Sequence, residues 1–296
     1  MARIVAAPGW NPIFNTTQPW DMDRRKPNPN GLAGGGPTFI LDRLAPMAGI
    51  GPVPDKSRLS SKPIPPRERL ILALDVPSLD EGKRWVERLG DSVQFYKLGL
   101  QLLMTGQYFE MVDWLAAQGK KVFADIKFFD VPETVKLAVE QLAHRKVDFA
   151  TVHGNDPMLE AAVSAKGAIK ILAVTVLTSL DRGDLDDLGF QCDPAELVLS
   201  RAKRAIKLGC DGVISSGLEA AALRDGLGQN FLVVSPGIRP VENRPADDQK
   251  RTVDVADAFL GGADYIVVGR PIRKAEDPRA KAEEIQATIA GIFTGK

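Results

Sequence analysis

From Arg67 onward, short apolar runs alternate with longer amphipathic stretches along the chain. Most of these runs are nearly continuous in apolar residues, which is typical of strands that are buried on both faces of a parallel sheet. The eight expected strands are Leu70–Leu74, Val93–Leu98, Lys121–Ile126, Val147–Val152, Ile169–Leu177, Gly212–Ser215, Phe231–Val234 and Tyr265–Val268.

The stretches between these runs carry apolar residues at helical spacing and charged residues on the other face. The expected helices are Leu79–Leu89, Leu102–Ala117, Glu133–His144, Met158–Ala165, Pro194–Leu208, Leu218–Leu227, Val253–Leu260 and Asp277–Ile292. An open doubly wound sheet usually has a Gly-rich loop after its first strand, where this chain has Asp75-Val76-Pro77. Eight strand–helix units in about 230 residues fit a (β/α)8 barrel better. The pattern therefore predicts an α/β protein with a TIM barrel over residues 67–296.

Residues 1–66 lack this rhythm and are rich in Pro, Gly and Asn. No periodic apolar segment of useful length occurs there, which is typical of irregular chain. The start does not combine a charged region with an apolar core, so we do not expect a secretory signal. We expect an irregular Pro/Gly-rich extension. It is either a passive tail or a docking segment that reaches a partner or a second subunit through side chains such as Trp10, Phe14 and Trp20.

The composition limits the classes of partner. The chain has 296 residues, of which 38 are Lys or Arg and 38 are Asp or Glu, so no excess of charge indicates a nucleic acid or an anionic membrane. Its two cysteines and two histidines are too few for a disulfide framework or a typical zinc site. No apolar run approaches the roughly 20 residues needed to span a bilayer. We expect a protein of the reducing cytoplasm.

The densest chemistry lies in F-A-D-I-K-F-F-D-V-P-E-T, Phe123–Thr134, which places two carboxylates around one ammonium. Asp125 and Lys127 are two positions apart, so on a strand their side chains point to the same side. Asp130 lies beyond the strand, where the chain must turn. Alternating charges tolerate burial when they are paired, which makes this segment a candidate catalytic site.

Further polar residues lie at the ends of other expected strands. In a TIM barrel the site forms at the carboxyl ends of the strands, where Asp75, Lys97 and Thr178 are expected. Taken singly, such residues can also have a purely structural role. The Lys97 side chain can extend to solvent, and Asp75 can cap the following helix. Their shared position at one end of one barrel favours a site.

The loops after the last two strands are expected to bind phosphate, as is usual in this architecture. Gly237 and Gly269 allow the backbone N–H groups to approach an anion closely. Arg239 and Arg270 offer planar guanidinium groups that suit phosphate oxygens, and Arg270 is expected to open the last helix. For Arg239 the alternative is a salt bridge to Asp247 or its neighbour.

Seven motifs follow one another along the predicted barrel. They are A-L-D (Ala73–Asp75), Y-K-L-G (Tyr96–Gly99), Phe123–Thr134, V-L-T-S (Val176–Ser179), S-P-G-I-R (Ser235–Arg239), D-D-Q-K-R (Asp247–Arg251) and V-G-R-P-I (Val268–Ile272). In residues and order they resemble the orotidine 5'-phosphate decarboxylase family, which forms uridine monophosphate in pyrimidine synthesis. The N-terminal extension lies outside this resemblance.

The resemblance implies a cofactor-free decarboxylation. Loss of CO2 from C6 of the pyrimidine leaves a carbanion, and no pyridoxal or thiamine electron sink is evident, so fixed charge must stabilise it. Lys127 is expected to provide this charge and to protonate C6. Asp125 holds Lys127 in place and lies near the departing carboxylate. Lys97 bridges Asp75, Asp125 and the ribose hydroxyls.

The resemblance also assigns substrate contacts and an assembly. Phosphate contacts fall on Gln249, Gly269 and Arg270, with Arg239 close by. Thr178 meets the edge of the pyrimidine. The family resemblance further implies a homodimer, in which Asp130, accompanied by Thr134, crosses into the neighbouring subunit's site.

Two other functions remain open. A sister activity on the same barrel acts on a sugar phosphate through a Mg2+-stabilised enediolate. Those relatives resemble the D-x-K-x-x-D pattern, but they place a metal-binding Glu where this chain has Lys97, whose ammonium would repel Mg2+. A catalytically silent phosphate-binding barrel is the third hypothesis, and it predicts a damaged charge array.

Other polar residues are expected to have no catalytic role. His153 follows the fourth strand and is expected to pack or to hold a loop, because no carboxylate or serine lies at the spacing of a nucleophile triad. His144 is expected to be a solvated residue at a helix end. Asp181–Asp187 are expected to form a solvated acidic loop.

Overall fold

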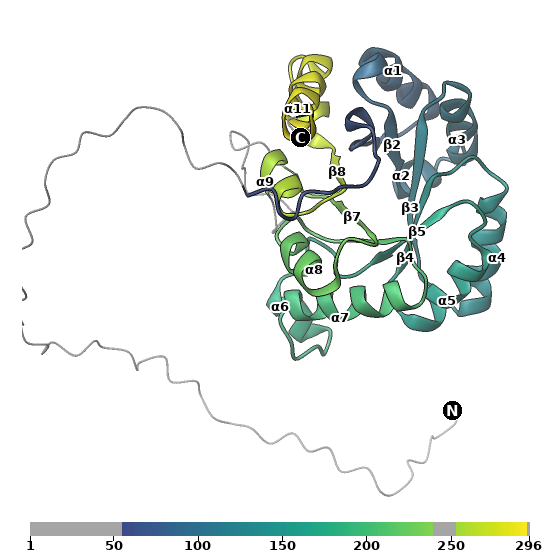
Figure 1. Cartoon of the computed structure of the whole chain (residues 1–296). Helices are drawn as coiled ribbons and strands as arrows, with labels where there is room; N and C mark the ends of the chain where they lie inside the picture. Colours follow the sequence, from purple (N-terminus) through teal and green to yellow (C-terminus); the bar gives the residue numbers. More distant parts are fainter. Residues whose placement is uncertain (1–54, 239–252, 295–296) are drawn as a thin grey trace, which may run out of the picture. The chain divides into compact units, whose positions relative to one another are not determined.

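The predicted strands close a parallel barrel in the order in which they occur in the chain (Figure 1). The structure, a computed structural model, describes residues 55–238 and 253–294. Its strands are β1 (Leu70–Ala73), β2 (Phe95–Leu98), β3 (Lys121–Phe128), β4 (Phe149–His153), β5 (Lys170–Val174), β6 (Gly212–Ile214), β7 (Leu232–Ser235) and β8 (Tyr265–Val268). Pairing of β1 with β8 closes the ring. The (β/α)8 TIM barrel is therefore confirmed.

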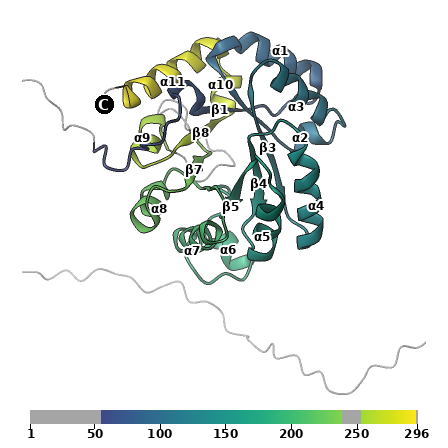
Figure 2. The same cartoon turned by 45° about the vertical axis from the view of Figure 1, so that its right-hand side comes forward.

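Helices cover the outside of the barrel in the described part of the chain (Figures 1 and 2). They are α1 (Leu79–Leu89), α2 (Leu100–Leu103), α3 (Tyr108–Ala117), α4 (Pro132–Ala143), α5 (Asp156–Ala165), α6 (Arg182–Asp187), α7 (Pro194–Lys207), α8 (Ala220–Leu227), α9 (Val255–Leu260), α10 (Arg270–Arg273) and α11 (Pro278–Phe293). Short 3-10 turns occupy Pro66–Glu68 and Gly90–Ser92. None of the helices in the described ranges is long and apolar enough to cross a membrane.

One helix prediction and one loop prediction were wrong. The stretch Leu102–Ala117 is not one helix, because α2 ends before Gly106, which has φ +76°, a conformation that glycine adopts most readily. The predicted acidic loop contains the helix α6. Asp181 caps this helix by accepting a hydrogen bond from the Asp184 N–H at 3.1 Å, and the Asp184 carboxylate accepts one from the Asp181 N–H at 2.8 Å. This reciprocal capping box offsets the weak helix propensity of the segment.

The strands are buried on both faces because they separate two apolar layers. The inner layer fills the barrel with Ile71, Ala73, Phe95, Phe123, Phe149, Leu172, Val174, Ile214, Leu232, Val234, Tyr265 and Val267. Alternate positions such as Leu70 and Leu72 point outward and pack under the helices. Inside the barrel, the Phe149 ring lies 4.9 Å from that of Phe95 and 5.1 Å from that of Tyr265. This packing gives the barrel a solid interior on which the site rests.

Aspartates support the opposite, amino-terminal end of the barrel in a repeating manner. Asp148, Asp211 and Asp264 each come directly before an even-numbered strand. Each carboxylate accepts a hydrogen bond, at 2.8 to 2.9 Å, from a backbone N–H of the preceding strand. The donors are Val122, Ile171 and Val233. The repeat ties β3 to β4, β5 to β6 and β7 to β8.

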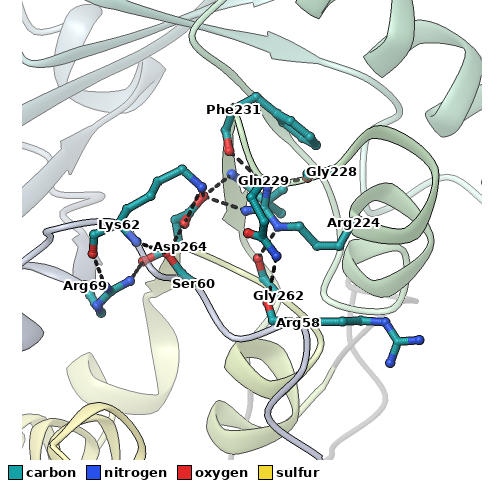
Figure 3. A network of polar contacts seen from close by, with 11 residues as sticks. Arg58, Ser60, Lys62, Arg69, Arg224, Gly228, Gln229, Phe231, Gly262 and Asp264 are labelled. Carbon is teal, nitrogen blue, oxygen red and sulfur yellow. Dashed lines mark hydrogen bonds and ion pairs between the residues drawn. The ribbon is translucent and has the colours of Figure 1, made fainter. Parts of the chain in front are cut away.

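Asp264 also anchors the segment that precedes the barrel (Figure 3). Its carboxylate has no exposed surface and lies 2.7 Å from the Arg224 guanidinium and 3.1 Å from the Lys62 ammonium. Ser60 donates a further hydrogen bond to it, and Ile64 packs against the inner layer. Charges buried in this way require paired partners, which the segment itself supplies.

The contacts of Asp264 join the residues just before Arg67 to the barrel. The described residues that precede Arg67 belong to the same compact unit as the barrel. The division into an extension, 1–66, and a barrel domain, 67–296, stays a prediction. Trp10, Phe14 and Trp20 lie outside the described residues.

Candidate active site

The carboxyl ends of the strands surround a cavity of about 300 Å³. Most of the residues predicted for the site line it together, namely Asp75, Lys97, Asp125, Lys127, Thr178, Gly269 and Arg270. They come from β2 and β3 and from the segments after β1, β5 and β8. The barrel therefore brings together side chains that lie up to 195 positions apart in the sequence.

Asp125 is the centre of the charge array. Its Oδ2 lies 2.9 Å from Nζ of Lys97, and its Oδ1 lies 2.8 Å from Nζ of Lys127. Lys97 also approaches Oδ1 of Asp75 at 3.9 Å. The carboxylate thus holds one ammonium on each oxygen, and the predicted alternation of charge exists in three dimensions.

Burial and charge act in opposite directions on these groups. Burial disfavours ionisation of Asp125, but the charges of Lys97 and Lys127 outweigh it and lower the pKa of Asp125 to about 2. Burial likewise disfavours the charged form of Lys97, yet the carboxylates of Asp125 and Asp75 raise the pKa of Lys97 above its ordinary value. Both groups therefore carry their charges at neutral pH.

Lys127 reaches the array through an unusual backbone conformation. Its φ is +56°, the only positive value at a non-glycine residue in the described ranges. The ladder between β3 and β4 is irregular at the same place, between Ala124 and Phe128. The sequence argument that Asp125 and Lys127 point to one side gave the correct result, but the strand that carries them is not regular.

The predicted phosphate end of the cavity is formed by Gly237, Gly269 and Arg270. Gly237 has φ +77°, which only glycine adopts without strain. A Cβ at Gly269 would lie 3.3 Å from the Cβ of Ala73, so a side chain there would crowd β1. The expectation that Arg270 opens the last helix was wrong, because it opens the separate four-residue helix α10.

Asp130 and Thr134 are exposed and do not line the cavity. The Asp130 carboxylate accepts a hydrogen bond from the Val131 N–H at 2.7 Å. The turn between β3 and α4 therefore directs the fourth charged residue away from the other three. Arg239 and Gln249, and with them Asp247, lie outside the described residues.

Several lining residues were not among the sequence candidates. Phe123, Val174, Ile214 and Val267 form an apolar floor below the charges. The sequence could have indicated them, because they occupy inward positions near the carboxyl ends of their strands.

Arg273 of α10 supports the site from outside the cavity lining. It donates a hydrogen bond to the backbone oxygen of Asp75, and no sequence signal distinguishes it from a surface arginine.

His153 is half-buried at the end of β4, and its ring packs edge-on against Phe129 at 4.7 Å. Burial and the charges of Arg201 and Lys127 lower the pKa of His153, so the imidazole is neutral at neutral pH. The contact with Phe129 fits the predicted packing role. His144 is exposed at the end of α4, as expected.

Comparison with known proteins identifies the family. A family model described as Orotidine 5'-phosphate decarboxylase / HUMPS family matches residues 68–285. The chain belongs to this family. The resemblance inferred from the seven motifs is therefore confirmed, and the match begins after the N-terminal region.

Individual members of the family are similar over nearly their whole length. An orotidine 5'-phosphate decarboxylase of Methylococcus capsulatus is 66% identical over 235 residues, which cover 79% of this chain and 97% of the relative. One from Xanthomonas axonopodis pv. citri is 53% identical over 229 residues, covering 77% and 94%. The crystal structure of the enzyme from Lactobacillus acidophilus, 34% identical, covers 75% of this chain and 99% of its own with a TM-score of 0.66.

Proposed function

We propose that this chain is a carboxy-lyase that converts orotidine 5'-phosphate into uridine 5'-monophosphate and CO2 in de novo pyrimidine synthesis. The observation that supports this most is the ion-paired set of Lys97, Asp125 and Lys127 at the carboxyl end of the barrel. Membership of the family and the printed names of the similar proteins agree with it. The balanced charge and two cysteines suit a cytoplasmic enzyme.

The chemistry proposed for the array is electrostatic and needs no cofactor. Departure of CO2 leaves negative charge at C6 of the pyrimidine, and an ammonium fixed nearby stabilises that charge as it develops. Lys127 is this ammonium, and it then gives a proton to C6. Asp125 holds the Lys127 ammonium at 2.8 Å. The ammonium of Lys97 helps to compensate the charge of Asp125. Because the array is paired before substrate binds, little reorganisation is needed during the reaction.

The remaining residues bind the substrate in this proposal. Asp75 and Lys97 contact the ribose, and Thr178 meets the edge of the pyrimidine. Gly269 and Arg270 bind the phosphate, joined by Gln249 and Arg239. The 300 Å³ cavity that contains most of these groups has the size of a small-molecule site.

The sister activity with Mg2+ is less well supported. It needs ligands for a hard cation where Lys97 lies, 2.9 Å from Asp125. An ammonium at this distance competes with a metal ion for the same carboxylate. Insensitivity of turnover to a chelator would distinguish the two activities. A silent barrel would bind uridine monophosphate without turning over the substrate.

A homodimer completes the proposed site. Asp130 and Thr134 are exposed on the turn into α4, so they can contact a second subunit. Large apolar side chains are exposed beside them, with Phe129 at 60% and Val131 at 62% of their full surface. Exposed apolar residues that gather in this way typically mark a protein interface.

The decisive experiment follows the absorbance of orotidine 5'-phosphate with the wild-type chain and the Lys127→Ala variant. We expect the wild type to consume the substrate and the variant to lose nearly all turnover, on the order of 1,000-fold or more, because the charge and the proton donor are both removed. Affinity for uridine monophosphate should fall less, since the phosphate contacts remain. Normal turnover by Lys127→Ala would exclude Lys127 as the proton donor.

A further inference from the structure

Thr151 of β4 contacts both catalytic partners of β3 through one hydroxyl. Its side chain is completely buried. Oγ1 donates a hydrogen bond to Oδ1 of Asp125 at 3.0 Å and accepts one from the backbone N–H of Lys127 at 2.9 Å. A hydroxyl has a single proton to donate, and here that proton goes to the central carboxylate.

The strand pairing explains why a side chain is needed at this place. Ala124 pairs with Ala150, and Phe128 pairs with Val152. Between these pairs β3 has three residues, 125 to 127, whereas β4 has only Thr151. The backbone of β4 therefore cannot continue a regular ladder, and the Thr151 hydroxyl takes the N–H of Lys127 instead.

The irregularity coincides with the left-handed conformation of Lys127. A φ of +56° is unfavourable for a residue with a long side chain unless its surroundings hold it there. The hydrogen bond from the Lys127 N–H to Thr151 is such a restraint. On its other side, the same hydroxyl shares Oδ1 of Asp125 with the Lys127 ammonium.

We propose that Thr151 is a positioning residue that fixes the backbone of Lys127 and the carboxylate of Asp125 in the geometry required for proton delivery. This inference rests on the proposed decarboxylase function. Thr151 does not line the cavity, so its effect on the reaction passes through the two residues that do. Without the hydroxyl, the Lys127 N–H loses a buried partner, and Oδ1 of Asp125 loses the donor that orients it alongside the Lys127 ammonium.

The test compares Thr151→Val, which keeps the shape and removes the hydroxyl, with Thr151→Ser, which keeps the hydroxyl. We expect kcat of Thr151→Val to fall by about 10- to 100-fold, because a small displacement of a reacting group has effects of this size. The affinity for uridine monophosphate should change by less than about threefold, since the phosphate end of the cavity is unaltered. Thr151→Ser should regain most of kcat.

Thr175→Val is the matched control. Thr175, directly after β5, is also completely buried, but its hydroxyl donates a hydrogen bond to the backbone oxygen of Ile214 at 2.8 Å. This variant loses the same group without touching Asp125 or Lys127, so it should lower the melting temperature while leaving kcat near the wild-type value. The proposal is overturned if Thr151→Val keeps wild-type kcat, or if its kcat falls no further than that of Thr175→Val.

Crystal structures of the wild type and Thr151→Val separate this proposal from the proposed function. We expect the variant to show Lys127 outside the left-handed region, or its ammonium displaced from Oδ1 of Asp125. If the wild type fails to consume orotidine 5'-phosphate, the proposed function is wrong. Even then, an unchanged Lys127 backbone and ion pair in Thr151→Val would show that Thr151 positions neither residue.

Discussion

At the scale of single residues, the charge of Asp125 determines how the site is held together. Two ammonium groups lie within 3 Å of its carboxylate, at 2.9 and 2.8 Å. A buried carboxylate between two cations stays ionised far into acid, whereas an isolated one would not. In turn, the carboxylates of Asp125 and Asp75 keep the ammonium of Lys97 charged far into base.

The pKa values of the array predict how stability depends on pH. The pKa of Asp125 falls from an ordinary 3.8 to about 2 on folding, so ionised Asp125 stabilises the fold above about pH 4, and this contribution is lost as the pH falls toward 2. Lys97 has a raised pKa, so its contribution is complete below its ordinary value of 10.5 and is lost only in stronger base. The pH profile of kcat should therefore show no titration of Asp125 or Lys97 between about pH 5 and 9.

Urea unfolding between pH 5 and pH 2.5 measures the acid limb. Other carboxylates also titrate in this range, so the Asp125→Asn variant is the control. Its free energy of unfolding should fall less steeply with acid than that of the wild type. Equal slopes for the two proteins would contradict the assigned pKa.

At the scale of elements, the two ends of the barrel have different tasks. The carboxyl ends of the strands carry the cavity, whereas the amino ends are joined by Asp148, Asp211 and Asp264. Asp264 additionally joins α8, through Arg224, to the segment that contains Ser60 and Lys62. Stability and chemistry are thus placed at opposite ends, as is general for TIM barrels.

Asp264→Asn should therefore destabilise the fold without changing the reaction. We expect a loss of about 3 to 5 kcal/mol in the free energy of unfolding, because Arg224 is left buried without its counter-charge. Chemical denaturation measures this loss, and kcat should stay unchanged at temperatures where the variant is folded. Asp225→Asn is the control, since its ion pair with Arg58 is exposed and should matter little. A variant Asp264→Asn as stable as Asp225→Asn would contradict the anchoring role.

At the scale of the whole molecule, the single chain brings together only part of the proposed site. Lys97, Asp125 and Lys127 lie in the cavity, whereas Asp130 is exposed on the turn into α4. Exposed Phe129 and Val131 flank it. A closed homodimer would cover these side chains and would place each Asp130 at the neighbouring site.

Mixed dimers test this arrangement. Lys127→Ala and Asp130→Ala should each have little activity alone. In a dimer that contains one chain of each variant, one of the two sites combines an intact Lys127 with an intact Asp130. Mixing the variants under conditions of subunit exchange should therefore restore activity. At most about half of the sites in each mixed dimer become active. If mixtures show only the summed activity of the separate variants, Asp130 acts within its own subunit.

The sequence by itself determined the barrel and the chemical identity of the site. Nearly continuous apolar runs require strands that are buried on both faces, and the charged residues at their ends, such as Lys97 and Asp125, follow from the motifs. Local rules are sufficient here, because strand burial and helix amphipathicity depend on neighbours a few positions apart. Element ends differed by a few residues, and α6 and α10 were missed, because capping and turn geometry outweighed composition.

Only the tertiary structure decided how the charges are held. Thr151 lies 24 positions from Lys127 and 26 from Asp125, and no spacing rule connects them. The left-handed backbone of Lys127 arises from an unequal pairing of β3 with β4, which exists only when the two strands are side by side. Contacts between distant segments fix these features, because the free energy that maintains them comes from packing in the closed barrel.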